Sequence, residues 1–249
     1  MRLAVLLFAL VLPSMSRATP DIVILGEVHD NAQAHLGQAE ALKDLQPSAV
    51  VFEMLTETQA ARADADRSQI SSAWEESGWR DFPIYVPIFE VLGKARIIGA
   101  AVPRATLRAV YANGAEAHFG PEAARYGLHE ALPEPEKNNR MKLQFEAHCE
   151  AMPFEMMAGM VTAQRFRDAA FARAALSALE TYGPPVTVIA GNGHARIDWG
   201  VPAMIARAAP GVTTHAIGFV EGDTDVPFDE TRIVPPVDRD DPCQSLRTE

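Results

Sequence analysis

Four polar side chains close or directly follow short apolar runs of the sequence: Glu27, His29, Glu53 and His194. In an open parallel sheet, ligands bind beyond the carboxyl ends of the strands. Side chains far apart in the sequence therefore converge at that edge. Two imidazoles and two carboxylates can hold a divalent metal or act as general acid and base. The sequence thus predicts a polar site where the strands end.

For a divalent metal ion, the predicted ligands are His29, Glu53 and His194, and Glu27 is the residue that would activate a water molecule. Each residue alone also has an ordinary structural reading, because a strand-end glutamate often caps a helix and a single histidine usually satisfies a local hydrogen bond. Three independent strand ends that carry His or Glu favour a genuine site. The other histidines are weaker candidates: His35, His118, His129, His148 and His215.

The strand ends belong to an alternation of strands and helices. Strands are predicted at 21–26, 49–53, 96–102, 186–190 and 213–220, with an edge strand at 231–234, and helices at 31–45, 56–65, 84–95, 104–111, 154–182 and 202–209. This order predicts an α/β fold with a mostly parallel central sheet flanked by helices. Asp30 or Asn31 is expected to cap the first helix, and Thr56 to begin the second.

The segment from about 115 to 165 interrupts the alternation. Residues 115–152 have no strand pattern, are rich in glutamate and contain Pro121, Pro133 and Pro135. We interpret the segment as a helical insertion or lid subdomain. An aromatic-rich stretch between Trp74 and Phe89 reads as core, with the wall of a flat aromatic ligand as the alternative.

Residues 1–18 have the pattern of a signal peptide. Arg2 precedes an uncharged apolar run of about ten residues, and the small residues Ser16 and Ala18 follow it. A bilayer span needs roughly 20 apolar residues, so the run is too short to cross a membrane. A buried N-terminal strand is the alternative. Residues 19–249 would then form one mature domain, soluble in the periplasm or secreted, and the cleavage region lacks the Cys of a lipid anchor.

The chain is acidic, with 22 basic residues, 33 acidic residues and a net charge of −11. Because the leader carries Arg2 and Arg17, the remainder has a net charge of −13. Such a protein does not favour phosphate backbones, so nucleic acid is not expected as a partner.

Cys149 and Cys243 are the two cysteines of the sequence. In an exported protein an even pair indicates a disulfide, which would join a helical middle segment to the C-terminal tail. Two free thiols are the alternative. The pair lacks the CxxC spacing of a zinc site.

The sequence resembles the ChaN-like haem-binding uptake family, within the Tiki/TraB/erythromycin-esterase-like superfamily. The resemblance is carried by Leu25-Gly-Glu-Val-His-Asp-Asn31, Phe52-Glu-Met54, and Gly191-Asn-Gly-His-Ala195 leading to Gly200-Val-Pro202. Further similar positions are Trp79-Arg-Asp-Phe82, Tyr85 with Pro87, Ala163-Gln164 with Arg167-Asp168, and Asp241-Pro-Cys243. These segments follow one another in order over nearly all of the mature chain.

The resemblance implies a parallel α/β fold with a helical subdomain and an exported protein of bacterial haem or iron uptake. It implies haem as the cofactor, a homodimer that encloses haem, and outer-membrane haem-uptake components as partners. The superfamily also contains metal-dependent hydrolases whose His and Glu residues correspond to His29, Glu53 and His194 here. A divalent metal ion is therefore the alternative cofactor.

One loop departs from the family pattern. Where the family has a tyrosine after Gly-Asn-Gly-His, this chain reads Arg196-Ile-Asp-Trp-Gly200. A tyrosinate can ligate ferric haem, whereas a tryptophan cannot. The substitute iron ligands are His194, Tyr85 and His148, and Arg196 could pair with a propionate. The predicted haem-contacting residues are His194, Asn192, Arg196, Tyr85 and Trp199.

Three functions follow from these residues. The first is a haem-binding protein of iron uptake, and the second is a metal-dependent hydrolase that shares the same pocket. The third is a structural or partner-binding protein with a vestigial site, which the acidic tail and the missing tyrosine support.

Overall fold

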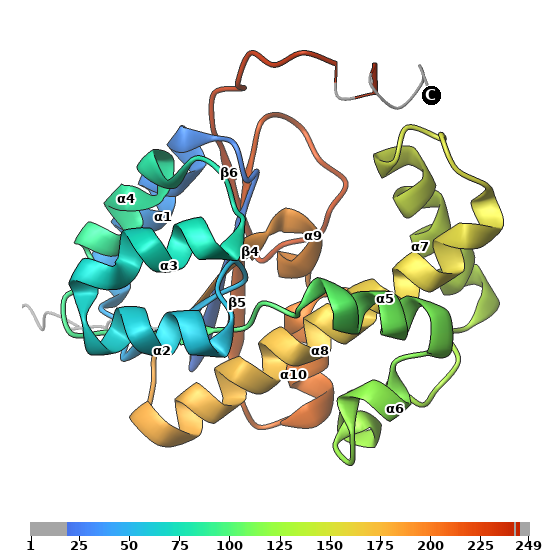
Figure 1. Cartoon of the computed structure of the whole chain (residues 1–249), viewed down its shortest axis with the longest axis horizontal. Helices are drawn as coiled ribbons and strands as arrows, with labels where there is room; N and C mark the ends of the chain where they lie inside the picture. Colours follow the sequence, from blue (N-terminus) through green and yellow to red (C-terminus); the bar gives the residue numbers. More distant parts are fainter. Residues whose placement is uncertain (1–18, 242, 245–249) are drawn as a thin grey trace, which may run out of the picture.

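The computed structural model describes residues 19–241 and 243–244, so the predicted signal peptide lies outside the described residues (Figure 1). The strands are β1 (Ile22–Glu27), β2 (Ala49–Phe52), β3 (Arg96–Gly99), β4 (Val186–Gly191), β5 (Thr214–Val220) and β6 (Glu230–Ile233). The α-helices are α1 (Ala32–Leu45), α2 (Glu57–Ala65), α3 (Ile70–Ser77), α4 (Phe82–Glu90), α5 (Arg104–Asn113), α6 (Glu116–Phe119), α7 (Glu134–Ala147), α8 (Met157–Tyr182), α9 (Asn192–Ala195) and α10 (Val201–Ala208). Short 3-10 helices are η1 (Arg67–Gln69), η2 (Ala123–Tyr126) and η3 (Phe154–Met156).

The six strands form one sheet in the order β3-β2-β4-β1-β5-β6, and every neighbouring pair is parallel. Parallel neighbours require crossover connections, which the helices supply. The predicted α/β fold with a parallel central sheet flanked by helices is confirmed. All strands therefore end at the same edge of the sheet, here called the carboxyl edge.

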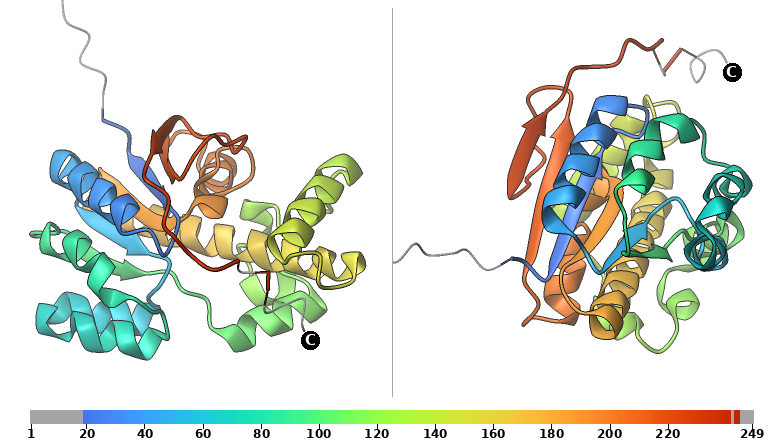
Figure 2. Two further views of the ribbon diagram at one scale, coloured as in Figure 1. Left: turned by 90° about the horizontal axis from the view of Figure 1, so that it is seen from above. Right: turned by 90° about the vertical axis from the view of Figure 1, so that its left-hand side faces the viewer.

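Helices cover both faces of the sheet, giving three layers (Figures 1 and 2). Because side chains alternate along a strand, Val23 and Leu25 of β1 face a core shared with α1, α3 and α4. Ile22 and Ile24 face the other core, which contains residues of α5, α8 and α10. Both cores are apolar, and β1 is buried along its whole length. The site residues at its end are thus fixed by a rigid central strand.

The helix starts next to the carboxyl edge agree with the sequence. The side chain of Asn31 accepts hydrogen bonds from the backbone of Gln33 and Ala34, which caps α1. Thr56 and Gln59 form a reciprocal capping box at the start of α2. These caps satisfy backbone donors that the helices cannot pair internally.

The predicted helix at 84–95 is wrong in its limits, because α4 spans Phe82–Glu90. Pro83 fits the first turn of a helix, where its missing N–H is not needed. The chain then turns into β3 through Gly93, whose φ is +53°, a conformation that glycine adopts easily. Helix α3 was not predicted from the sequence. Its buried Trp74 and the aromatic residues of α4 pack together as core.

The segment 115–165 is helical in the structure, and α7 with η3 and the first turns of α8 form a projecting helical hairpin, here called the arm (Figures 1 and 2). Its own core has only three buried side chains: Met141, Met157 and Val161. Arg140 of α7 contacts the body of the protein: its guanidinium lies 4.9 Å from the ring centre of Trp199.

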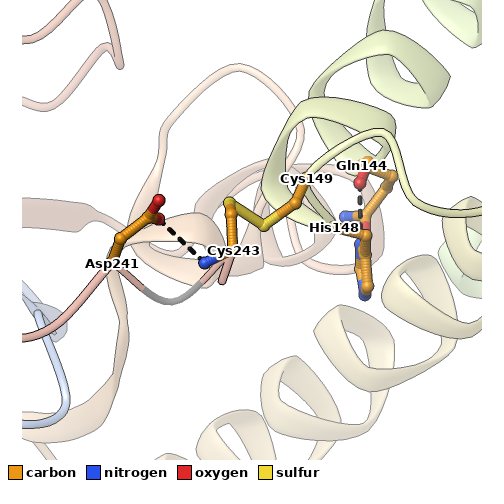
Figure 3. Close-up of a disulfide and its surroundings, with 5 residues drawn as sticks. All are labelled: Gln144, His148, Cys149, Asp241 and Cys243. Atoms are coloured by element: carbon orange, nitrogen blue, oxygen red, sulfur yellow. Dashed lines mark hydrogen bonds between the residues drawn. A yellow bond between two sulfur atoms is a disulfide. The ribbon is translucent and has the colours of Figure 1, made fainter. Parts of the chain in front are cut away.

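The predicted disulfide between Cys149 and Cys243 is present, with 5.4 Å between the two Cα atoms (Figure 3). Cys149 lies at the tip of the arm, just beyond α7. The chain segment that leaves β6 crosses the carboxyl edge toward the arm (Figure 2), and Cys243 follows it in the sequence. We call this segment, residues 234–241 with Cys243, the strap.

No helix within the described residues is long and apolar enough to cross a membrane.

A glycine at the end of β3 gives a test of the packing between the sheet and α2. A Cβ at Gly99 would lie 2.2 Å from the carbonyl oxygen of Thr56, and this backbone atom cannot move aside cheaply. Gly99→Ala is therefore expected to lower the free energy of unfolding by about 1–3 kcal/mol, as other overpacked sites do. Urea denaturation would measure the loss. Gly211→Ala is the control, because no atom lies within 4 Å of its added Cβ; equal midpoints for the two variants would contradict the expectation.

Candidate functional site

The four side chains predicted to converge do lie at the carboxyl edge. Glu27 is the last residue of β1, and His29 follows in the loop toward α1. Glu53 directly follows β2, and its backbone N–H still donates to Ile189 of β4. His194 is in α9, immediately after β4. Three neighbouring strands of the sheet therefore carry the site.

Glu27 is a buried, ionised carboxylate held by four side chains. Its Oε1 accepts hydrogen bonds from the hydroxyl of Tyr85 at 2.5 Å and from Nδ1 of His29 at 2.8 Å. Its Oε2 accepts one from Gln38 at 2.9 Å and lies 3.4 Å from Nδ1 of His35. Burial alone would raise the pKa of Glu27, but the hydrogen bonds and charges of the two histidines outweigh it and lower the pKa to about 2.

His29 is the most exposed side chain of this group, with 40% of its side-chain surface accessible. Its ring contacts Trp79 edge-on at 4.7 Å between centroids. Burial lowers the pKa of His29, but the hydrogen bond to Glu27 and the charge of Glu53 outweigh it, so the pKa lies above its usual 6.5. A histidine whose Nδ1–H is held by a carboxylate has a fixed tautomer and offers Nε2 to a ligand.

Glu53 joins β2, β4 and α8. Its Oε2 accepts a hydrogen bond from the backbone N–H of Gly191 at 2.7 Å, and its Oε1 accepts one from the guanidinium of Arg167. The same Oε1 lies 3.6 Å from Nε2 of His194. Burial opposes ionisation, yet the charge of Arg167 and the hydrogen bond from Gly191 help to lower the pKa of Glu53 below its usual value.

His194 is buried against Asp168 of α8, with 2.5 Å between its Nδ1 and Oδ1 of the carboxyl group. Gln164 lies one turn away on α8, with its Nε2 3.1 Å from the same Nδ1. Burial lowers the pKa of His194 to about 3, and burial raises the pKa of Asp168 well above its usual value. Burial thus disfavours the charged form of both groups, and their hydrogen bond joins α8 to α9.

Gly191 lies at the centre of the site. Its N–H binds Glu53, and a Cβ at this position would lie 2.8 Å from Nε2 of His29. A side chain here would displace the imidazole, so the close packing of His29 on β4 requires glycine.

The predicted divalent metal site is not supported by the structure. Among the described residues, no group of three or more His, Cys, Asp or Glu side chains is arranged to hold a metal ion. The physical reason is that each predicted ligand already has another partner. His29 binds Glu27, Glu53 binds Arg167, and His194 binds Asp168. The Nδ1 atoms of both histidines and the carboxylate of Glu53 are therefore directed at these partners and not at a common centre.

Comparison with known proteins shows the family of this chain. The sequence model of the haem-binding uptake family of the Tiki superfamily, ChaN, matches residues 15–205. The chain belongs to the ChaN family. The structure that describes cofacial haem binding to ChaN of Campylobacter jejuni superposes with a TM-score of 0.62 at 18% sequence identity, covering 85% of this chain and 86% of that one. A succinoglycan biosynthesis protein gives a TM-score of 0.39 at 12% identity, over 80% of this chain and 65% of that one. No match was found among curated protein sequences.

In this ChaN-family chain, the remaining residues predicted to contact haem have protein partners. Tyr85 is 1% exposed and its hydroxyl binds Glu27. Asn192 donates to the carbonyl of Phe219 at 2.7 Å. Arg196 is paired through two nitrogens with Asp198, and its guanidinium lies 3.5 Å from the ring centre of the partly exposed Trp199. Their predicted contacts with haem stay proposals.

His148, the third substitute iron ligand, lies at the C-terminal end of α7 and is partly exposed. Its Nδ1–H donates to the backbone carbonyl of Gln144 at 2.7 Å (Figure 3). Because a carbonyl only accepts, Nδ1 carries the hydrogen in this bond, and Nε2 is the ring nitrogen without a partner in the bond. His194, by contrast, is 4% exposed.

The α8 side chains that complete the site are at positions similar to the family, but they were not predicted as site residues. Gln164, Arg167 and Asp168 are spaced three and four residues apart, which puts them on one helix face. That spacing was a usable signal, because three polar residues on one face of a long helix need partners when the face is buried. His35, treated as a weak candidate, is fully buried and belongs to the Glu27 cluster.

Proposed function

We propose that this ChaN-family chain is an exported haem-binding protein of bacterial haem or iron uptake. The observation that carries the proposal is the match to the haem-binding uptake family over residues 15–205. The disulfide adds support for an extracytoplasmic location, because such bonds persist in oxidising compartments. A homodimer and outer-membrane uptake partners belong to the same proposal.

The donor set of the described residues fits haem. When bound, haem would supply an iron atom that takes a nitrogen or oxygen ligand and two propionates that pair with cations. His29 and His148 are partly exposed imidazoles whose Nδ1 is already engaged. Arg167 is partly exposed beside His29, with 27% of its side-chain surface accessible. We therefore assign His29 and His148 as iron ligands in place of the missing tyrosine, and Arg167 as a propionate partner.

A haemin titration tests the proposal. Purified disulfide-bonded protein is expected to give a saturable shift of the Soret band. His29→Ala and His148→Ala are each expected to weaken binding at least tenfold, because each removes an iron–nitrogen bond. His118→Ala is the control, since this exposed histidine has no role in the proposal. A linear, unsaturable response from the unmodified protein would overturn the proposed function.

Haem binding should also depend on pH. Iron and a proton compete for Nε2 of His29, and the bond to Glu27 raises the pKa of His29 above 6.5. Affinity is therefore expected to fall as the pH is lowered through this raised pKa. Haemin titrations between pH 5.5 and 8.5 would show the fall, and His29→Ala should lose it.

A further inference from the structure

The two ends of the central sheet differ in whether their outer backbone groups have partners. At the β3 end, the outward N–H of Ile97 donates to the carboxylate of Asp64 on α2 at 2.8 Å. The N–H of Ala101 donates to the carbonyl of Leu55 at 2.8 Å, in the segment between β2 and α2. A further strand cannot pair at this end without breaking these bonds, so the β3 end is closed.

At the opposite end, β6 has an open edge. The backbone N–H of Val234 donates to the carbonyl of Val220 at 2.8 Å and continues the parallel ladder between β6 and β5. In a strand, the N–H and C=O groups of alternate residues point to opposite sides. Thr231 and Ile233 therefore direct theirs away from β5. Among the described residues, none forms a hydrogen bond to these outward groups, and Figure 2 shows β6 as the outermost strand.

The side chains along this edge are accessible. Thr231 is exposed, and Ile233 has 67% of its surface exposed. On the other face of β6, Arg232 donates to Glu230 at 2.6 Å, and both side chains are partly exposed. An unpaired strand edge is a template for pairing with another chain. The strap follows β6 directly and begins Val234-Pro-Pro236, and because proline has no N–H, any pairing is confined to this short segment.

We propose that the edge of β6 pairs antiparallel with β6 of a second copy of this chain, so that two sheets become one continuous sheet. A second copy fits because the segment Glu230-Thr-Arg232 is complementary to itself. Outward-bonding residues face each other in an antiparallel pair. With Thr231 opposite the partner's Thr231, each Glu230 lies opposite the partner's Arg232. Opposite charges on facing strands stabilise the pairing.

The charges also select this register over its neighbour. The neighbouring register sets Thr231 opposite the partner's Ile233, which places Arg232 opposite the partner's Arg232. Like charges directly opposite each other destabilise a strand pair. The contact centred on Thr231 has twofold symmetry, in which both copies use the same surface. Since the β3 end of each sheet is closed, the pairing stops at two copies.

The pairing fixes how the two candidate sites are oriented. All neighbouring strands within one copy are parallel, so an antiparallel pair of β6 strands directs the two carboxyl edges to opposite sides. The two sites then do not face each other. This contact is therefore separate from a homodimer that encloses haem, and the inference does not rest on the proposed haem-binding function.

Sedimentation equilibrium of disulfide-bonded protein prepared without haemin tests the pairing. The contact is small, so a weak dimer is expected, with the mass rising toward that of two copies between about 10 µM and 1 mM protein. Thr231→Pro removes the outward N–H and leaves the bonds to β5 in place, and should weaken dimerisation at least tenfold. Asp223→Pro, in the exposed loop between β5 and β6, is the matched control and should dimerise as the unmodified protein does.

Two results of this experiment would overturn the inference. The first is an unmodified protein that keeps the mass of one copy over the whole range. The second is a dimer that persists in Thr231→Pro, because its contact then lies elsewhere on the protein. Haemin takes no part in the measurement, so neither result bears on the proposed haem-binding function.

Exchange of charges tests the register in variants that keep every backbone donor. Arg232→Glu places glutamates opposite each other and should weaken dimerisation at least tenfold. Adding Glu230→Arg to that variant places opposite charges face to face again and should restore the dimer. Arg62→Glu makes the same change of net charge on α2, where Arg62 forms an exposed ion pair with Glu76, and should leave dimerisation unchanged. A double variant that stays as weak as Arg232→Glu would contradict the contact centred on Thr231.

Discussion

Glu27→Ala is expected to lower the free energy of unfolding by about 3–5 kcal/mol, the typical cost of removing one partner from a buried charged cluster. The carboxylate is fully buried and receives hydrogen bonds from Tyr85, His29 and Gln38, with His35 close by. Alanine leaves these buried groups without an acceptor, and each unpaired polar group costs free energy. Urea denaturation at pH 6 would measure the loss.

Glu40→Ala is the matched control, because Glu40 is exposed on the same α1 that carries Gln38. Surface substitutions of this kind usually change stability by less than about 0.5 kcal/mol. Similar urea midpoints for the two variants would show that the Glu27 cluster does not stabilise the fold.

The contribution of the Glu27 cluster to the free energy of unfolding depends on pH, and the sign of this dependence is predictable. The pKa of Glu27 is lowered from 4.5 to about 2, so its contribution is present above pH 4.5 and is lost as the pH falls toward 2. The pKa values of His29 and His35 are raised above 6.5, so their contribution is present below 6.5 and is lost as the pH rises through the raised values. The cluster therefore stabilises the protein most between about pH 4.5 and 6.5. Glu27→Gln should flatten this maximum, and NMR titration should show a lower pKa for His29.

Replacing Arg167 is expected to lower the free energy of unfolding more than replacing its ion-pair partner Glu53. Glu53 has 1% of its side-chain surface exposed, whereas Arg167 has 27%. Arg167→Met leaves a buried carboxylate without its main cation, which costs about 3–5 kcal/mol in comparable pairs. Glu53→Gln leaves an arginine that can turn toward water, so its cost should be smaller.

A double-mutant cycle measures the interaction itself. Arg167→Met combined with Glu53→Gln should recover part of the loss, with a coupling energy of about 0.5–3 kcal/mol. In Arg167→Met the pKa of Glu53 should rise, so that variant should lose stability on acidification before the unmodified protein does. If the glutamate variant is the less stable of the two, desolvation of Glu53 is not the controlling factor.

Local patterns in the sequence were sufficient for most of the fold. The apolar strands at β1 and β4, the caps at Asn31 and Thr56, and the pairing of the two cysteines were all predicted from residue type and spacing. The strands and caps depend on contacts between neighbours in the sequence, and the disulfide follows from the presence of two cysteines. The limits of α4 were wrong, and α3 was missed, because both lie in an aromatic-rich stretch where apolar periodicity is not informative.

The site was predictable only in part. The predicted parallel sheet implied that Glu27, Glu53 and His194 would lie along one edge, and they do. The hydrogen-bond partner of each side chain was not predictable, because Arg167 and Asp168 are on α8 and reach the site only through tertiary packing. The metal prediction was not supported for this reason: it assumed that the side chains were free to point at a common ion.

The disulfide also sets an order of events during synthesis. Its two cysteines are 94 residues apart, and β4, β5 and β6 lie between them. At about 5–20 residues per second, Cys149 waits roughly 5–20 s for its partner to emerge. During that time it is an unpaired thiol, able to form mixed disulfides with other proteins. The disulfide can therefore form only after β4, β5 and β6 have all been synthesised.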